Sequence, residues 1–252
     1  MAEPLLRLER VGKRFGGLLA VDDVSLGIEA GRITALIGPN GAGKTTLFSI
    51  ISGFQPPSAG RIFHRDADIT GLAPHLLARR GIARTFQIAK PFAGLTVREN
   101  IAIGAHLSRR SRADALAAAA DIAGLVGLAD LLDRPAASLT TAGSKRLEVA
   151  RALATGPKLL LLDEVLAGLN PAEVAAMVPT LRALVDRGIT ILMIEHVMQA
   201  VMSLAAHVFV LVEGCIVAEG APQAVVGNPR VVEAYLGHGA AARLSAAGGG
   251  HA

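Results

Sequence analysis

Aromatic residues and cysteine are scarce in this 252-residue chain, which has no tryptophan, one tyrosine and an aromatic fraction of 3%. Hydrophobic residues nevertheless make up 52% of the sequence, which is enough for a large core. With so few aromatic side chains, that core must be built from Leu, Val, Ile and Ala. Cys215 is the only cysteine, which excludes an intramolecular disulfide and fits a reducing cytoplasm. This composition favours an α/β protein with buried parallel strands.

Long apolar runs are also missing. No stretch approaches the roughly 20 apolar residues that span a bilayer, and residues 1–10 lack the apolar region of a signal peptide. We therefore expect that the chain is not a channel or carrier by itself. The net charge of +4 comes from scattered Lys and Arg residues. Such scatter favours a solvated surface over a nucleic-acid site, and it suits a protein resting against an anionic inner membrane leaflet.

A glycine-rich stretch stands between a predicted strand at residues 33–37 and a predicted helix at residues 45–52. It fits G-x-x-x-x-G-K-[ST], the phosphate-binding P-loop, and the order of strand, loop and helix argues against a simple glycine-rich turn. Its backbone can aim several N–H groups at one anion, and the helix dipole adds positive potential. Lys44 can reach the outer phosphates, and Thr45 offers a hydroxyl to Mg²⁺. The predicted phosphate-binding residues are Gly38, Pro39, Asn40, Gly41, Ala42, Gly43, Lys44, Thr45 and Thr46.

Two carboxylates follow an apolar run at residues 159–162, which predicts a strand buried on both faces. In α/β proteins, ligands bind at the carboxyl edge of the sheet. Asp163 can therefore hold Mg²⁺ opposite Thr45, and Glu164 can polarise the water that attacks the phosphate. The alternative is that Asp163 only caps the next segment, and the P-loop upstream argues against it.

Two more polar side chains follow predicted strands. Gln87 comes after a strand at residues 82–86 and can contact the metal or the water, although taken alone it is better explained as an ordinary loop amide. His196 follows a strand at residues 189–194, where it can hydrogen-bond a γ-phosphate or the attacking water.

The remaining pattern predicts the domain organisation. Alternating polarity at residues 5–10 and 22–28 indicates two antiparallel strands, and residues 208–219 indicate a hairpin around Glu213 and Gly214. Residues 112–125 and 143–155 are predicted to be helical. No strand signal occurs over residues 88–139, which we interpret as an inserted α-helical subdomain. We predict an α/β fold with a P-loop NTPase core and mixed sheet, an antiparallel β subdomain and an inserted α-helical subdomain. The domain spans residues 5–237, the helical subdomain about 88–139, and a Gly- and Ala-rich disordered tail 238–252.

Taken together, the order of these motifs resembles the nucleotide-binding subunit of an ATP-binding cassette (ABC) transporter over about residues 5–237. The resemblance implies that Mg²⁺ and ATP bind and that ATP is hydrolysed, with Phe15 stacking on adenine. By this resemblance, Asp163 corresponds to the Walker B carboxylate and Glu164 corresponds to the catalytic base. Gln87 becomes the Q-loop residue, which contacts the metal and couples the site to the membrane subunits, and His196 becomes the switch histidine.

The resemblance also implies partners. Such subunits pair head to tail, as homodimers or heterodimers, and each ATP lies between the P-loop of one subunit and the signature motif of the other. The signature aligns with residues 139–143, where Thr140 and Gly143 would contact the partner's nucleotide. Membrane permease subunits and, indirectly, a solute-binding protein complete the expected assembly, on the cytoplasmic face of the inner membrane and without nucleic acid.

The signature departs from the family pattern, because Leu-Ser-Gly-Gly-Gln is replaced by Leu-Thr-Thr-Ala-Gly. Thr140 keeps a hydroxyl, but the Cβ of Ala142 can crowd the γ-phosphate. Val165 also replaces a proline that usually follows the Walker B glutamate.

The subtype is indicated by residues 68–72, 82–87, 167–171 and 234–237, which look like the branched-chain amino acid importer ATPases. Importers of urea and amides share much of this pattern and remain an alternative, as does a degenerate regulatory module paired with an active subunit. An ABC ATPase acting on DNA or ribosomes would usually carry coiled coils or two cassettes. A P-loop GTPase would need an Asn-Lys-x-Asp run, which the chain lacks.

Overall fold

The computed structural model describes residues 3–87, 90–109 and 111–236. Its larger sheet has six strands in the order β10-β9-β3-β8-β7-β6. All neighbours pair in parallel except β10, which pairs with β9 as the predicted antiparallel hairpin. The strands are β3 (Ile33–Ile37), β6 (Ile82–Arg84), β7 (Leu159–Asp163), β8 (Thr190–Ile194), β9 (His207–Val212) and β10 (Cys215–Gly220).

A second, antiparallel sheet has the order β2-β1-β4-β5. Its strands are β1 (Leu6–Phe15), β2 (Leu18–Ile28), β4 (Ala59–His64) and β5 (Ala67–Asp68). The two strands predicted at the N-terminus are confirmed, but they extend further toward each other, and Gly16 and Gly17 make the short connection between them.

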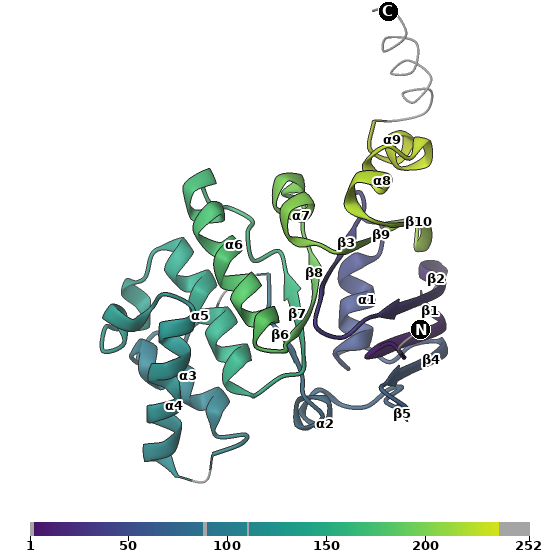
Figure 1. The fold of residues 1–252 in the computed structure, drawn as a ribbon. Helices are drawn as coiled ribbons and strands as arrows, with labels where there is room; N and C mark the ends of the chain where they lie inside the picture. The colour runs from purple at the N-terminus through teal and green to yellow at the C-terminus, as the bar shows by residue number, and fades with distance from the viewer. Residues whose placement is uncertain (1–2, 88–89, 110, 237–252) are drawn as a thin grey trace, which may run out of the picture.

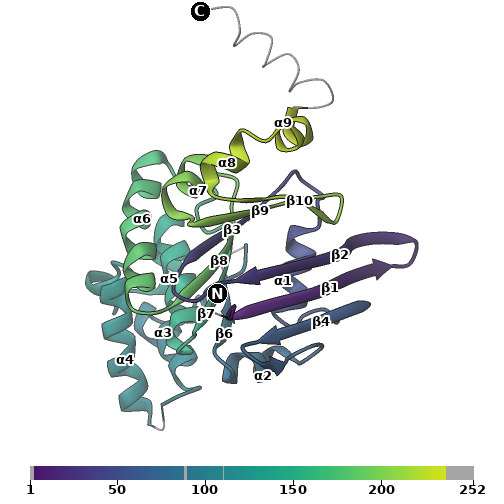
Figure 2. The same ribbon diagram turned by 45° about the vertical axis from the view of Figure 1, so that its right-hand side comes forward.

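Helix α1 (Lys44–Ile51) lies between the two sheets (Figure 2). Its buried Leu47, Phe48 and Ile51 join one core cluster with side chains of β1 and with alternate residues of the parallel strands, such as Leu161 and Leu192. Successive strand residues point to opposite faces of a sheet, so the other residues of the same strands face the opposite side.

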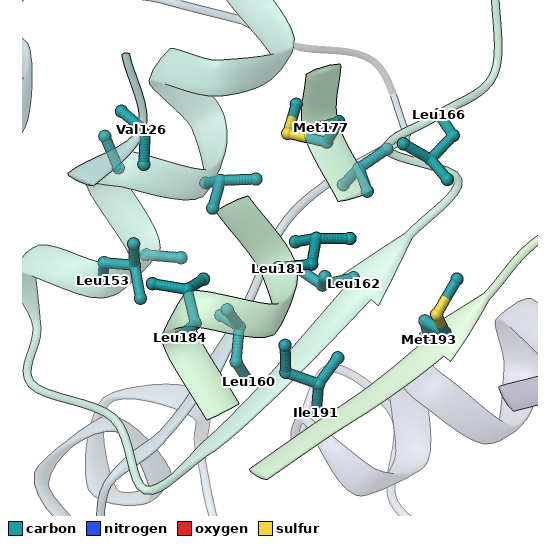
Figure 3. Close-up of a cluster of buried hydrophobic side chains, with 14 of the residues drawn as sticks. Val126, Leu153, Leu160, Leu162, Leu166, Met177, Leu181, Leu184, Ile191 and Met193 are labelled. Atoms are coloured by element: carbon teal, nitrogen blue, oxygen red, sulfur yellow. The ribbon is translucent and has the colours of Figure 1, made fainter. Parts of the chain in front are cut away.

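That opposite face is covered by α5 (Thr141–Ala154), α6 (Pro171–Asp186) and α7 (Met198–Leu204) (Figure 1). Figure 3 shows Leu181 and Leu184 of α6 against Leu160 and Leu162 of β7, all four buried. The apolar run over residues 159–162 is thus buried on both faces, as predicted.

A block of helices extends from this layer (Figure 1). It contains α3 (Val97–Ala105) and α4 (Arg112–Leu125), which pack against α5, with short 3₁₀ turns at Ala129–Leu131 and Ala136–Ser138. Over the described part of residues 88–139 no strand is formed apart from one isolated bridge, between Thr96 and Pro135. The remaining helices are α2 (Pro74–Arg79), α8 (Pro222–Val226) and α9 (Pro229–Leu236).

Several details differ from the sequence prediction. Strand β6 ends at Arg84 rather than at residue 86, α5 begins two residues earlier than expected, and α8 was not predicted. The earlier start of α5 places most of residues 139–143 in its first turn, because the Thr140 hydroxyl caps the helix. No helix in the described ranges is long and apolar enough to cross a membrane. The tail predicted at residues 238–252 lies outside the described residues.

Candidate functional site

The P-loop connects β3 to α1 and needs glycine at two of its positions. A Cβ built on Gly38 would lie 2.0 Å from the carbonyl oxygen of Leu211, and one built on Gly43 would lie 2.3 Å from that of Ala20. Gly43 also has a φ of 101°, which side chains rarely adopt. The loop is therefore pressed against the β2 and β9 segments of the backbone, and this contact holds it in a tight turn.

Helix α1 begins without a side-chain cap and without an acidic residue in its first turn. The first N–H groups of a helix have no partner within the helix, and its N-terminus carries partial positive charge. These groups face a cavity of about 600 Å³ that is lined by residues 40–46. The geometry suits a phosphate group.

Lys44 lies under the loop rather than extended into solvent. The side chain is buried, and its Nζ donates hydrogen bonds to the carbonyl oxygens of Gly38 at 2.7 Å and Pro39 at 2.9 Å. Burial lowers the pKa of Lys44, whereas the charges of Glu164 and Asp163 act in the opposite direction. A phosphate would give this amine an anionic partner in place of neutral carbonyls.

The other walls of the cavity come from distant parts of the chain, and include Phe15, Gln87, Glu164 and His196. Phe15 lies at the end of β1 with 44% of its surface exposed, and the Nζ of Lys13 lies 5.0 Å from the centre of its ring. A cavity of this volume is typical for a small ligand, and an exposed aromatic ring at its edge can stack on a base.

Three predicted catalytic residues meet through hydrogen bonds. The carboxylate of Glu164 accepts a hydrogen bond from Gln87 Nε2 at 2.6 Å, and its other oxygen lies 2.7 Å from His196 Nε2. The three residues follow β6, β7 and β8, which are neighbours in the sheet. Parallel strands end at the same edge, so the strand order brings the three side chains together.

Asp163 is buried at the end of β7, where one carboxylate oxygen accepts a hydrogen bond from Arg84 Nη2 at 2.7 Å. Arg84 also donates to the hydroxyls of Ser49 on α1 and of Ser52, the residue that follows this helix, both at 3.1 Å. This guanidinium therefore joins the end of β7 to the helix that follows the P-loop.

The three predicted metal ligands, Thr45, Gln87 and Asp163, line a second cavity of about 470 Å³. Their hydroxyl, amide and carboxylate oxygens are ligands suited to Mg²⁺. Arg84 binds only one oxygen of Asp163, and a carboxylate has two. The oxygens of these three residues therefore fit a magnesium ion, in a cavity whose wall also carries the basic residues Arg84, Lys90 and Arg151.

Thr140 and Gly143 lie apart from this cluster and line neither cavity. The Thr140 hydroxyl accepts a hydrogen bond from the Gly143 N–H at 3.1 Å, which caps α5. Thr140 is exposed, whereas Gly143 is buried against Leu139. Within one chain these two residues are thus brought to each other and not to the P-loop.

Three charged residues near the site were not predicted to act there: Arg84, Lys145 and Glu195. Glu195 is 1% exposed, and one of its oxygens accepts a hydrogen bond from the Leu166 N–H at 2.9 Å. Burial is the largest cause that raises the pKa of Glu195, to about 7. The sequence signal that could have identified them is a charged residue within or directly after an apolar strand, or on the apolar face of a helix. Burying such a charge costs free energy unless the charge has partners.

Comparison with known proteins gives consistent matches. The family described as "ABC transporter" matches residues 21–167, and the family described as "Branched-chain amino acid ATP-binding cassette transporter" matches residues 215–241. The chain is 39% identical to the high-affinity branched-chain amino acid transport ATP-binding proteins BraF of Pseudomonas aeruginosa and LivG of Escherichia coli. Both alignments cover 94% of this chain and 99% of the relative.

Solved structures show the same architecture. A nucleotide-free ATP-binding cassette from an ABC transporter superposes with a TM-score of 0.85 at 35% identity, covering 92% of this chain and 98% of that one. The ADP conformation of an ATP-binding cassette superposes with a TM-score of 0.86, also at 35% identity, covering 94% and 100%.

Proposed function

This chain belongs to the ABC transporter family of ATP-binding proteins, and we propose that it hydrolyses ATP to power the import of branched-chain amino acids. The observation that carries the proposal is the hydrogen-bonded group of Gln87, Glu164 and His196 at the wall of the P-loop cavity. The cargo follows from the relatives, which are named as branched-chain amino acid transport proteins, and from the matching C-terminal family segment.

In the proposed reaction, the N–H groups at the start of α1 and the amine of Lys44 bind the phosphates, and Phe15 stacks on the adenine. Glu164 accepts the proton of the attacking water as the new P–O bond forms and the bond to the ADP oxygen breaks. Gln87 and His196 each bind one oxygen of Glu164. They thereby hold its carboxylate in one orientation.

Thr45, Gln87 and Asp163 are the residues that would hold Mg²⁺. The ion, when bound, neutralises the negative charge of the phosphates. Arg84 sets the position of the Asp163 carboxylate through their ion pair, so the protein presents this oxygen ligand in a defined place.

The assembly is also a proposal. We propose that two ATPase subunits pair head to tail and that Thr140 and Gly143 of each contact the nucleotide of the other. The ATPase domain then spans residues 5–237, with a helical subdomain at about 88–139. The pair would bind permease subunits at the cytoplasmic face of the membrane and be served by a solute-binding protein, in keeping with relatives named as ATP-binding proteins of transport systems.

The ATPase proposal is tested with the purified full-length chain and two matched variants. Wild type should hydrolyse Mg-ATP, and Glu164→Gln should lose about 100-fold or more of the turnover while binding ATP as tightly as wild type. Glu219→Gln, which removes an exposed carboxylate on the edge strand β10, should behave as wild type. Unchanged turnover in Glu164→Gln would remove the assignment of the base.

The cargo is tested in cells in which this coding sequence is disrupted and then restored as wild type or as Glu164→Gln. Uptake of radiolabelled leucine, isoleucine and valine should return only with wild type. Urea and short amides are measured in parallel. Restoration of urea uptake without leucine uptake would support the alternative importer class and refute the branched-chain assignment.

One observation favours a second candidate function, a regulatory ATP-binding module. The Gly143 N–H already donates a hydrogen bond to the Thr140 hydroxyl, so this N–H is engaged within the chain rather than free for a γ-phosphate. In that case the isolated chain would bind ATP without turnover, and activity would appear only on mixing with a second ATPase subunit. Steady turnover by the isolated chain would exclude this role.

A further inference from the structure

Lys145 lies in the second turn of α5, and its side chain is buried, with 8% of the residue exposed. Its Nζ donates one hydrogen bond to the carbonyl oxygen of Gln87 and one to that of Glu164, both at 2.9 Å. These are two of the three residues whose side chains meet at the P-loop cavity. A single amine thus binds the backbone of two residues that stand 77 positions apart in the sequence.

Burying an ammonium group is unfavourable unless hydrogen bonds replace its water. An apolar side chain at this position of α5 would fill the space without that cost. The two carbonyl contacts give the charge a defined place. Packing alone therefore does not explain why a lysine stands at this buried position.

Glu164 needs support in its backbone. Its φ is 50°, in the left-handed region that a residue with a side chain rarely adopts. Such a conformation persists only where the surroundings hold it. Here the N–H of Glu164 donates to the carbonyl oxygen of Ile194 at 3.0 Å. Its carbonyl oxygen accepts from Lys145 at 2.9 Å and from the Ala167 N–H at 3.2 Å. These hydrogen bonds hold both peptide groups that flank the proposed base, and Lys145 supplies the one that comes from α5.

We propose that Lys145 is a positioning residue that sets the orientation of Glu164 and Gln87 and makes it depend on the position of α5. The inference rests on the proposed ATPase function. Helix α5 starts at the exposed cap Thr140, about 7.5 Å along the axis from Lys145. Since a helix moves as a rigid rod over such a length, a shift of its exposed start also moves the amine. Contact of a partner with this start would then be transmitted to the base.

The neighbouring residue provides a matched control. Arg146 is also a basic residue of α5, but its Nη1 donates to the carbonyl oxygen of Val126 at 3.1 Å, within the helical block. Arg146→Gln therefore removes a cation and a hydrogen bond from the same helix without touching Gln87 or Glu164. A purely structural role for the basic residues of α5 predicts similar effects from both substitutions.

The test measures steady-state ATP hydrolysis and equilibrium ATP binding with the full-length chain. Lys145→Gln should lower kcat about 10- to 100-fold, because a displaced catalytic group loses that much. ATP affinity should stay within about threefold, because the P-loop is untouched. Lys145→Arg, which keeps the charge and the donors, should lose less turnover than Lys145→Gln, and Arg146→Gln should stay near wild type.

A double-variant comparison separates positioning from general damage. If Lys145 acts through Glu164, adding Lys145→Gln to Glu164→Gln should not lower the residual rate further, since interacting residues are non-additive. Multiplicative losses, or a kcat for Lys145→Gln equal to that of Arg146→Gln, would overturn the inference. Wild type without any ATPase activity would instead overturn the proposed function on which the inference rests.

Discussion

Glu195 offers the sharpest test of the electrostatics at this site. Its carboxyl group lies directly after β8, is 1% exposed and accepts one hydrogen bond, from the Leu166 N–H. Its Oε2 has no hydrogen-bond partner among the described residues. Burial, with the nearby charge of Glu164 as a smaller contribution, raises the pKa of Glu195 from 4.5 to about 7. The perturbation is Glu195→Gln, which keeps an oxygen for Leu166 and cannot ionise.

The sign of the effect follows from linkage. Between pH 4.5 and about 7 the unfolded carboxyl has lost its proton and the folded one retains it, so stability falls as pH rises. Each pH unit in this window lowers the free energy of unfolding by about 1.4 kcal/mol, and the loss is complete above pH 7 at about 3.5 kcal/mol. Since the loss at pH 5.5 is already about 1.4 kcal/mol, roughly 2 kcal/mol remains to be lost by pH 8.5.

The assay is urea unfolding of the full-length chain, followed by circular dichroism near pH 5.5 and pH 8.5. The stability advantage of Glu195→Gln over wild type should grow by about 2 kcal/mol between the two conditions. Glu29→Gln is the control, because it removes an exposed carboxylate whose pair with Arg32 is worth less than about 1 kcal/mol. An advantage that is the same at both pH values would refute the argument that Glu195 is held neutral.

Three other substitutions test separate parts of the site. Phe15→Ala should weaken ATP binding about tenfold in an equilibrium titration, because stacking on a base contributes about 1–3 kcal/mol. Phe15→Tyr should preserve the affinity. Equal ATP affinities for wild type and Phe15→Ala would contradict the stacking role. Arg84→Met should lower the free energy of unfolding in urea by about 3–5 kcal/mol, because the buried Asp163 carboxylate loses its partner; a loss below about 1 kcal/mol would contradict this. Gly43→Ala places a methyl group 2.3 Å from a backbone oxygen at a φ of 101°, whereas Gly71→Ala has open space at a φ of 68°. Gly43→Ala should therefore lower the free energy of unfolding in urea by about 1–3 kcal/mol more than Gly71→Ala. Equal losses would show that the loop rearranges to accommodate the methyl group.

Much of the fold could be predicted because its signals are local. The bounds of β3 and α4 were predicted to the residue, and the turn at Glu213 and Gly214 was located from two residues of loop between apolar runs. Boundaries were less accurate where side chains decide them. The start of α5 depends on the hydrogen bond from the Gly143 N–H to the Thr140 hydroxyl, and an apolar pattern does not encode that bond.

The site shows the same division. The residues from Gly38 to Thr46 predict a phosphate loop by themselves, because the spacing of their glycines, Lys44 and Thr45 fits the motif. The close approach of Gly38 to Leu211 and of Gly43 to Ala20 appears only in the folded chain. That Gln87, Glu164 and His196 share a hydrogen-bonded group follows from the order of β6, β7 and β8 in the sheet. A resemblance to a family can anticipate this grouping, but the spacing of the three residues along the chain cannot.

The sequence by itself determined which segments form strands, loops and helices and which loop is predicted to bind phosphate. These features depend on the periodicity and conformational freedom of neighbouring residues. Only the tertiary structure decided what surrounds that loop. The pairing of Arg84 with Asp163, the contacts of Lys145 with Gln87 and Glu164, and the burial of Glu195 join residues that are far apart in the chain. Their energies come from burial and from short distances across strands and helices, and these exist only once the two sheets and the helical block have packed together.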